Sequence, residues 1–206
     1  MLLAAPFAAL GTAAEGGTAF HARFVNDETP EAAEVHRLGE DAINRLVVAL
    51  VREVTSALTK VGPEGAVDIC HLKALPMTNG TVAGLPRITA VKRTSFKIRK
   101  PANAPNAAEQ LVLDFIKRQL DNGDAPSRLL VQRVEPASAA PEWRVYKPLA
   151  ATAKCLACHG DPAGQSSELR AKLSALYPAD QATGYNVGEW CGLIRVTVAD
   201  APVKKP

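Results

Sequence analysis

The pentapeptide Cys155-Leu156-Ala157-Cys158-His159 constrains the fold of this chain most strongly. Two cysteines two residues apart, followed at once by histidine, are the attachment signature of a c-type haem. The two thiols would form thioethers with the haem vinyl groups, and the adjoining imidazole of His159 would bind the iron as the proximal axial ligand. The fold must therefore leave room beside this segment for one flat, covalently attached haem.

Two other kinds of site use the same side chains. A structural zinc ion needs about four ligands, usually from two close pairs, and the remaining candidates Cys70, His71 and Cys191 contain no second CxxC. A thioredoxin-like redox pair needs a βαβ context and no histidine. Here a short strand pattern precedes the motif over residues 143–148, and a glycine- and proline-containing loop follows it over 160–164. The context therefore favours haem attachment.

Length and charge exclude several other classes of protein. With 206 residues, of which 47% are hydrophobic, the chain can bury one core, and we expect a single domain over residues 29–200. The 24 basic and 21 acidic residues give a net charge of +3 without a long basic run. The sequence therefore lacks the footprint of a nucleic-acid-binding protein.

Residues 1–14 are mostly small and apolar and end in Thr12-Ala13-Ala14. They fit the apolar core and cleavage site of a secretory signal. No Lys or Arg precedes Arg23 to provide the usual basic start, which leaves two interpretations: the sequence starts inside a longer signal, or the prediction of export is wrong. The segment is too short to span a bilayer, and we expect no stable membrane span. As in cytochromes c, a covalent haem would be attached outside the cytoplasm, which predicts a periplasmic or otherwise exported protein.

A long amphipathic helix is predicted near the N-terminus. Thr29-Pro30-Glu31 combines a capping hydroxyl, proline at the first helical position and an acid in the first turn. Apolar residues then recur mainly at helical spacings along one broad face. They are Val35, Leu38, Ile43, Leu46, Val47, Leu50, Val51, Val54, Ala57, Leu58 and Val61. Gly62-Pro63 ends this helix and starts a shorter one, which carries Cys70 and His71 and runs to Leu75.

The remaining patterns combine strands and helices. Asn106 and Glu109 form a capping box for a helix that Asn122-Gly123 closes. Strand patterns occupy residues 88–96, 128–134, 143–149 and 191–198, and a short helix is expected over 168–176. This order predicts an α+β domain in which helices flank a central antiparallel sheet, preceded by the long helix.

Two familiar classes of cytochrome conflict with these patterns. The strands disagree with the four-helix bundle of a cytochrome c′. In addition, no methionine follows Cys155 to act as the distal ligand of a small electron-transfer cytochrome.

The haem motif stands among other characteristic segments. They are Ala66–His71, Arg93–Ser95, Arg99 with Pro101–Asn106 and Glu109, Tyr146–Pro148, Tyr177–Asp180 and Ala182–Glu189. Together with the motif they resemble a family of c-type haem proteins with a PAS-like fold, found as free exported proteins and as the sensing part of membrane receptors and kinases. The resemblance implies a PAS-like sheet and one covalent haem c. It also implies a helix cysteine as the second axial ligand, a position that Cys70 occupies. Lys100, where an asparagine is expected, and Cys191, where an arginine is expected, depart from the pattern.

Cys70 has competing interpretations. As a thiolate ligand it would push electron density onto the iron and favour the ferric state. It could instead be a small buried residue, or form a disulfide with Cys191 in an oxidising compartment. His71 and then Met77 are the next candidates for the distal ligand. Adjacent helical residues point about 100° apart, so at most one of Cys70 and His71 can face an iron.

Basic and aromatic side chains are candidates for contact with the haem. Guanidinium and ammonium groups suit the carboxylates of the propionates. The basic cluster comprises Lys92, Arg93, Lys97, Arg99 and Lys100. We select Arg93 from this cluster, although such charges more often only solvate a strand. Tyr146 and Tyr185 are aromatic candidates for the wall of the pocket, and we select Tyr146 as a haem contact.

These observations together predict an exported monohaem c-type cytochrome. It would respond to redox state or to a small gas such as nitric oxide through a haem ligated by His159 and Cys70, with the gas or a redox partner protein as its partner. The alternative is a simple one-electron carrier. No general base, nucleophile or second metal cluster points to an enzyme, although peroxidase-type chemistry at an opened iron stays open. The stripe of the long helix would suit either packing on the sheet or a homodimer.

Overall fold

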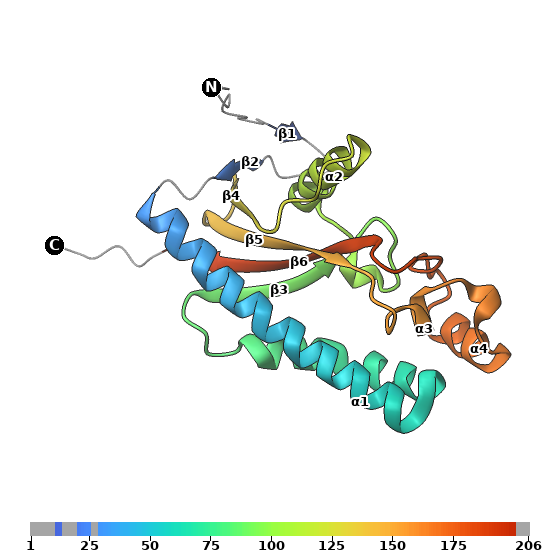
Figure 1. The fold of residues 1–206 in the computed structure, drawn as a ribbon. Helices are drawn as coiled ribbons and strands as arrows, with labels where there is room; N and C mark the ends of the chain where they lie inside the picture. Colours follow the sequence, from blue (N-terminus) through green and yellow to red (C-terminus); the bar gives the residue numbers. More distant parts are fainter. Residues whose placement is uncertain (1–10, 14–19, 26–28, 201–206) are drawn as a thin grey trace.

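The computed structural model describes residues 11–13, 20–25 and 29–200, and for 11–13, 71–79 and 81–82 it describes the backbone alone. Six strands form one antiparallel sheet in the order β1-β2-β4-β5-β6-β3 (Figure 1). The centre of the sheet contains β4 (Leu130–Pro136), β5 (Glu142–Ala150) and β6 (Trp190–Ala199), and β3 (Ile88–Thr94) lies at one edge. Helices lie on both faces of the sheet, which confirms the predicted α+β architecture.

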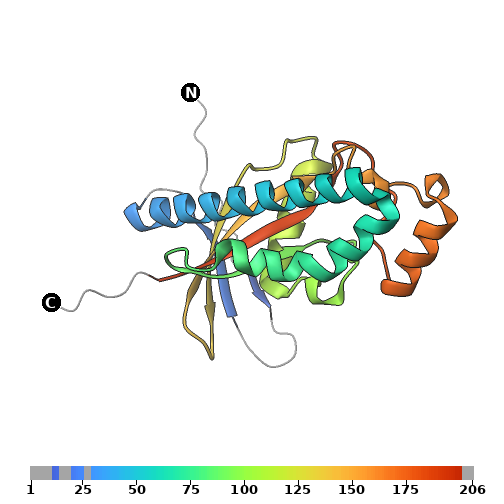
Figure 2. The ribbon, with the colours of Figure 1, turned by 90° about the horizontal axis from the view of Figure 1, so that it is seen from below.

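Helix α1 (Pro30–Val82) folds back on itself at Gly62. Gly62 has φ 68° and ψ −179°, a backbone conformation that glycine adopts at little steric cost. Two arms result, residues 30–61 and 63–82, and Figure 2 shows them side by side as a hairpin. The predicted break at Gly62-Pro63 is therefore confirmed. The predicted end of the second helix at Leu75 is wrong, because the second arm continues through Pro76. A proline removes one backbone hydrogen bond and disfavours a helix, but it does not always end one.

The first arm of α1 packs its apolar stripe on one face of the sheet. Ile43 and Leu46 are fully buried there, among apolar residues of β4, β5 and β6. Gly39 lies so close to β5 that an added Cβ would be 2.4 Å from the side chain of Val145. Further along, stripe residues Val51 and Val61 are 55% and 50% exposed, because this part of the arm extends past the sheet (Figure 2).

Helix α2 (Ala107–Asp121) covers the opposite face of the sheet (Figure 1). The predicted capping box is present: the Asn106 side chain accepts a hydrogen bond from the Glu109 backbone N–H at 3.0 Å, and the Glu109 carboxylate accepts one from the Asn106 N–H at 2.9 Å. Glu109 is fully buried and also pairs with Lys92 at 2.7 Å and Arg195 at 3.0 Å. This carboxylate therefore fastens α2 to β3 and β6.

Two strands that the sequence patterns did not predict extend the sheet at its other edge. β2 (Phe20–Val25) pairs with β4, and β1 (Gly11–Ala13) pairs with β2. The rest of the signal-like segment, residues 1–10 and 14, lies outside the described residues, so its interpretation stays a prediction. None of the helices in the described part of the chain is long and apolar enough to cross a membrane.

Short elements surround the CxxCH motif. Helix α3 (Leu156–His159) contains most of it, and the 3₁₀ helix η2 (Pro162–Gly164) and helix α4 (Ser167–Leu176) follow. A second 3₁₀ helix, η1 (Pro101–Asn103), connects β3 to α2. The buried side of α4 packs on Val67 in the second arm of α1. The motif therefore lies at the end of the sheet, beside the bend of α1.

Candidate cofactor site

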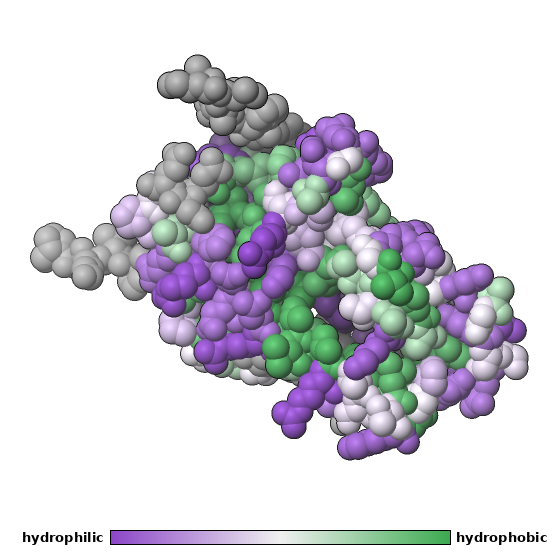
Figure 3. Space-filling model, in the orientation of Figure 1, coloured by the Kyte–Doolittle hydropathy of each residue, from purple (hydrophilic) through white to green (hydrophobic). Residues whose placement is uncertain are grey.

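A cavity of about 470 Å³ lies between the bend of α1, the ends of β3 and β5, α3, and the loop that leads into β6. Its volume lies within the range of about 300–1,000 Å³ that small-molecule and cofactor sites occupy. Three apolar residues of the α1 stripe, Leu50, Val54 and Leu58, form one wall. Figure 3 shows hydrophobic surface on both sides of a hollow in this region. The stripe predicted from the sequence thus serves both the core and this cavity.

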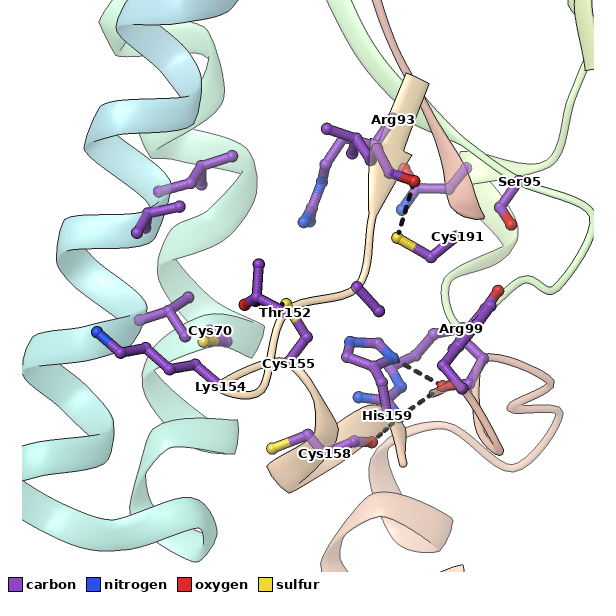
Figure 4. Close-up of a pocket in the computed structure, with 18 of the residues that line it drawn as sticks. Cys70, Arg93, Ser95, Arg99, Thr152, Lys154, Cys155, Cys158, His159 and Cys191 are labelled. Atoms are coloured by element: carbon purple, nitrogen blue, oxygen red, sulfur yellow. Dashed lines mark hydrogen bonds between the residues drawn. The ribbon is translucent and has the colours of Figure 1, made fainter. Parts of the chain in front are cut away.

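A single helical turn places the cysteine and histidine side chains of the CxxCH motif at the cavity. The backbone N–H groups of Cys158 and His159 donate to the Cys155 carbonyl at 3.2 and 2.9 Å, and all three side chains line the cavity (Figure 4). The turn ends at Gly160, whose N–H donates to the Leu156 carbonyl at 2.9 Å. A Cβ on Gly160 would lie 2.7 Å from that same oxygen, so the turn closes tightly only with glycine.

The imidazole of His159 is held in one tautomer. Its Nδ1 lies 2.7 Å from the carbonyl oxygen of Ala182. Because a carbonyl only accepts hydrogen bonds, Nδ1 carries the proton and Nε2 keeps a free lone pair. Burial, assisted by the nearby Arg99 cation, lowers the pKa of His159 to about 4, so the ring is neutral near pH 7. A neutral imidazole whose Nδ1–H donates to a carbonyl is the usual form of a histidine metal ligand.

Cys70 lies across the cavity from His159. It lines the cavity from the second arm of α1, whereas His159 enters from α3 (Figure 4). Burial raises the pKa of the Cys70 thiol, and the Arg93 cation opposes that rise. Because Cys70 and Cys191 are both free thiols, the disulfide alternative is not formed. The side chains of His71 and Met77, the other candidate ligands, lie outside the described residues.

Cys191 lines the same cavity at the start of β6. Its thiol donates a hydrogen bond to the Leu149 carbonyl at 3.4 Å, and burial raises its pKa to about 11. This hydrogen bond fixes the thiol against the backbone of β5. Cys191 therefore behaves as a half-buried structural residue.

Arg93 points from β3 into the cavity (Figure 4). Burial lowers the pKa of its guanidinium, and within the described part of the chain no hydrogen bond or ion pair joins that group to another residue. Other members of the basic cluster have partners: Lys92 pairs with Glu109, and Lys97 donates to the Thr183 carbonyl at 3.2 Å. A cation held among apolar groups is costly without an anion, so Arg93 suits a carboxylate placed in the cavity.

Tyr146 does not line the cavity, which corrects its selection as a cofactor contact. It is fully buried under α2, where its hydroxyl donates to Gln132 at 2.8 Å. Successive side chains of a strand point to opposite faces of the sheet, so Val145 faces α1 and Tyr146 faces α2. Tyr185, the other aromatic candidate, does line the cavity.

Sequence patterns did not identify the residues that support His159. Arg99 contacts Asp180 and the Cys158 carbonyl, at 2.9 and 2.6 Å, and the Ala182 carbonyl accepts from His159. Arg99 was one of several candidates in a basic cluster. The Ala182 acceptor is a backbone carbonyl, which a motif of side chains cannot identify. The segments Tyr177–Asp180 and Ala182–Glu189 carried part of the family resemblance, which was the available signal.

The residues of the cavity fit a covalently attached haem. Two thiols one helical turn apart could hold the vinyl groups, Nε2 of His159 could hold the iron, and the guanidinium of Arg93 could pair with a propionate. For the zinc alternative, the described side chains contain no group of three or more His, Cys, Asp or Glu placed to hold a metal ion. The donor groups that line the cavity are therefore compatible with a haem.

Comparisons with known proteins agree with this fold. A family model described as Tll0287-like matches residues 43–199, which include the CxxCH motif and both arms of the cavity wall from α1. The solved crystal structure of the cyanobacterial heme-protein Tll0287 is 19% identical, with a TM-score of 0.54, and the match covers 86% of this chain and 98% of that chain. At this identity the likeness shows the fold alone. No curated protein matches the chain.

Proposed function

Because the chain belongs to the Tll0287-like family, we propose that it is a monohaem c-type cytochrome. Cys155 and Cys158 tether the haem, and Nε2 of His159 ligates its iron. The observation that carries this proposal is the neutral imidazole, which is locked by its 2.7 Å hydrogen bond to Ala182 with Nε2 available in a cavity lined by both cysteines. The description of Tll0287 as a heme-protein supports the same cofactor.

The residues that line the cavity have separate roles in the proposed function. When bound, the haem supplies one-electron chemistry and an iron whose axial ligand can be exchanged. The apolar α1 stripe excludes water, and Arg93 pairs with a propionate and offsets its charge. The Ala182 carbonyl polarises the His159 ring and makes Nε2 a stronger donor.

We further propose that Cys70 is the second axial ligand and that its bond is the responsive element. Its thiol is not in a disulfide and faces the cavity opposite His159. A thiolate donor stabilises ferric iron, so reduction or a competing small gas such as nitric oxide would weaken its hold. Cys70 lies on the second arm of α1, which joins the first arm at Gly62. Release of Cys70 would let this arm move, which is the two-state element that sensing requires.

The competing role is that of a one-electron carrier, in which both ligands stay bound in both oxidation states. We propose sensing because Cys70 lies beyond the bend at Gly62, on the second arm of α1, which packs on α4. The protein would act in the periplasm or another exported compartment, where covalent haem is attached. In either role the partner is a redox protein or a small gas, and the function is not enzymatic.

Haem attachment tests the proposal most simply. The chain is co-expressed with cytochrome c maturation proteins, and intact mass and the pyridine haemochrome spectrum are measured. We expect one haem per chain that resists extraction by acidified acetone, and its loss when Cys155 and Cys158 are both replaced by Ala. Cys191→Ala is the matched control, because it removes a thiol from the same cavity and should retain the haem. A wild-type chain without covalent haem contradicts the proposal.

A further inference from the structure

The carbonyl that fixes His159 belongs to a segment without regular secondary structure. Residues 177–185 form neither helix nor strand, yet Ala182 in this segment accepts the Nδ1–H of His159 at 2.7 Å. A helix or sheet cannot set the position of this carbonyl. Other contacts must hold it in place.

Backbone hydrogen bonds fix both sides of Ala182, from the Gln181 N–H to the Ile98 carbonyl at 2.9 Å and from the Tyr185 N–H to the His159 carbonyl at 3.0 Å. Arg99 and Asp180 make the side-chain contacts. The Asp180 carboxylate accepts a hydrogen bond from the Ala182 backbone N–H at 2.9 Å, and it pairs with Nε of Arg99 at 2.9 Å. The guanidinium also donates to the Cys158 carbonyl at 2.6 Å and, more weakly, to the Ala182 carbonyl at 3.4 Å. Arg99 thus contacts the residue before His159 as well as the residue that His159 bonds.

The Arg99–Asp180 pair is shielded from water. Their side chains are only 14% and 12% exposed. Partly buried, charge-assisted hydrogen bonds are stronger than surface ion pairs and are screened less by salt. The planar fork of arginine suits several acceptors in one plane, whereas lysine provides a point charge. Replacement of Arg99 by lysine would therefore keep the positive charge and lose these contacts.

We propose that Arg99 is the positioning residue for His159. Through Asp180 and the carbonyls of Cys158 and Ala182, it holds the imidazole with Nδ1–H on Ala182 and Nε2 toward the haem. This inference rests on the proposed function, in which Nε2 of His159 ligates the iron. Groups that orient a histidine ligand fix its tautomer and raise its donor strength.

Two effects of Arg99 have opposite signs, and this makes the inference testable. A well-oriented Nδ1–H bond strengthens the donor and favours ferric iron. The positive charge of Arg99 near the iron favours ferrous iron. Arg99→Lys keeps the charge and removes the fork, so positioning predicts a rise in reduction potential, whereas a purely electrostatic role predicts none.

The experiment compares the haem-loaded wild type with Arg99→Lys by optical redox titration and ferric EPR. We expect the equilibrium to shift about threefold from ferric toward ferrous haem. At 59 mV per tenfold change for one electron, this shift raises the reduction potential by about 30 mV. The EPR signal should broaden as the ring samples several orientations. Arg170→Lys is the control, because Arg170 also donates to a backbone carbonyl, that of Pro162, outside the cavity lining. An unchanged or lowered potential with an unchanged EPR signal overturns the inference.

Asp180→Asn provides a second test that does not depend on the folding of the lysine variant. The amide keeps the shape of the carboxylate and can still accept from Ala182, but it weakens the bond to Arg99. We expect the same broadening of the ferric EPR signal, and a wild-type line shape would refute the positioning role. If the wild type holds haem and the variants keep its reduction potential and EPR signal, this inference alone is refuted. If the wild type holds no haem, the proposed function is refuted.

Discussion

The turn that ends α3 leaves no room for a side chain at Gly160, and Gly160→Ala tests how strictly the haem motif depends on it. The added Cβ would lie 2.7 Å from the Leu156 carbonyl oxygen and 3.2 Å from the Leu156 Cβ. Relief of this overlap requires a backbone shift, which costs about 1–3 kcal/mol. The shift would also stretch the hydrogen bond from the Gly160 N–H to that carbonyl, which contributes about 1 kcal/mol.

Together these terms lower the free energy of unfolding by about 2 kcal/mol or more. For a chain of this size, 1 kcal/mol corresponds to about 2–4 °C in Tm, so we expect a decrease of about 4–8 °C. Gly164→Ala is the matched control, because nothing lies within 4 Å of its added Cβ. Thermal unfolding followed by circular dichroism measures both variants. Equal Tm values for the two would refute the steric reasoning.

Three further predictions concern residues at and away from the cavity. Arg93→Ala should lower the reduction potential of the haem-loaded protein, because the cavity loses a cation that favours ferrous iron; an unchanged potential in a redox titration would remove Arg93 from the site. Tyr146→Phe should lower the free energy of unfolding by about 1 kcal/mol through loss of its bond to Gln132, with no change in haem spectrum; a spectral change would contradict its place under α2. Glu109→Gln should cost about 3 kcal/mol in urea unfolding, because the buried Arg195 and the half-buried Lys92 lose their anionic partner; a cost below 1 kcal/mol would contradict the fastening role.

Local signals in the sequence predicted several elements correctly. The capping box of Asn106 and Glu109 depends on two residues three positions apart, and the helix begins there as expected. Likewise, the apolar spacing of the first arm of α1 and the break at Gly62 follow from short-range rules. Strand β2 was missed because Phe20–Val25 is short and carries His21 and Arg23 among its apolar residues.

Features that depend on distant contacts could not be predicted in the same way. Arg99 and Asp180 are 81 positions apart, and nothing local pairs them. Tyr146 was assigned to the wrong face, because the alternation of a strand buried on both sides does not say which face meets the cofactor. The second role of the α1 stripe, as a cavity wall, depends on where the sheet ends, which is also a matter of tertiary packing.

Ligation by Cys70 is the central claim of the proposed function, and an optical redox titration of the haem-loaded protein beside Cys70→Ala tests it most directly. Axial ligand identity sets haem potential more strongly than other features of the protein. We predict a low potential in the wild type that rises in Cys70→Ala with an altered ferric spectrum, and no change in Cys191→Ala. Identical spectra and potentials for the wild type and Cys70→Ala would contradict ligation by Cys70 and favour simple electron transfer.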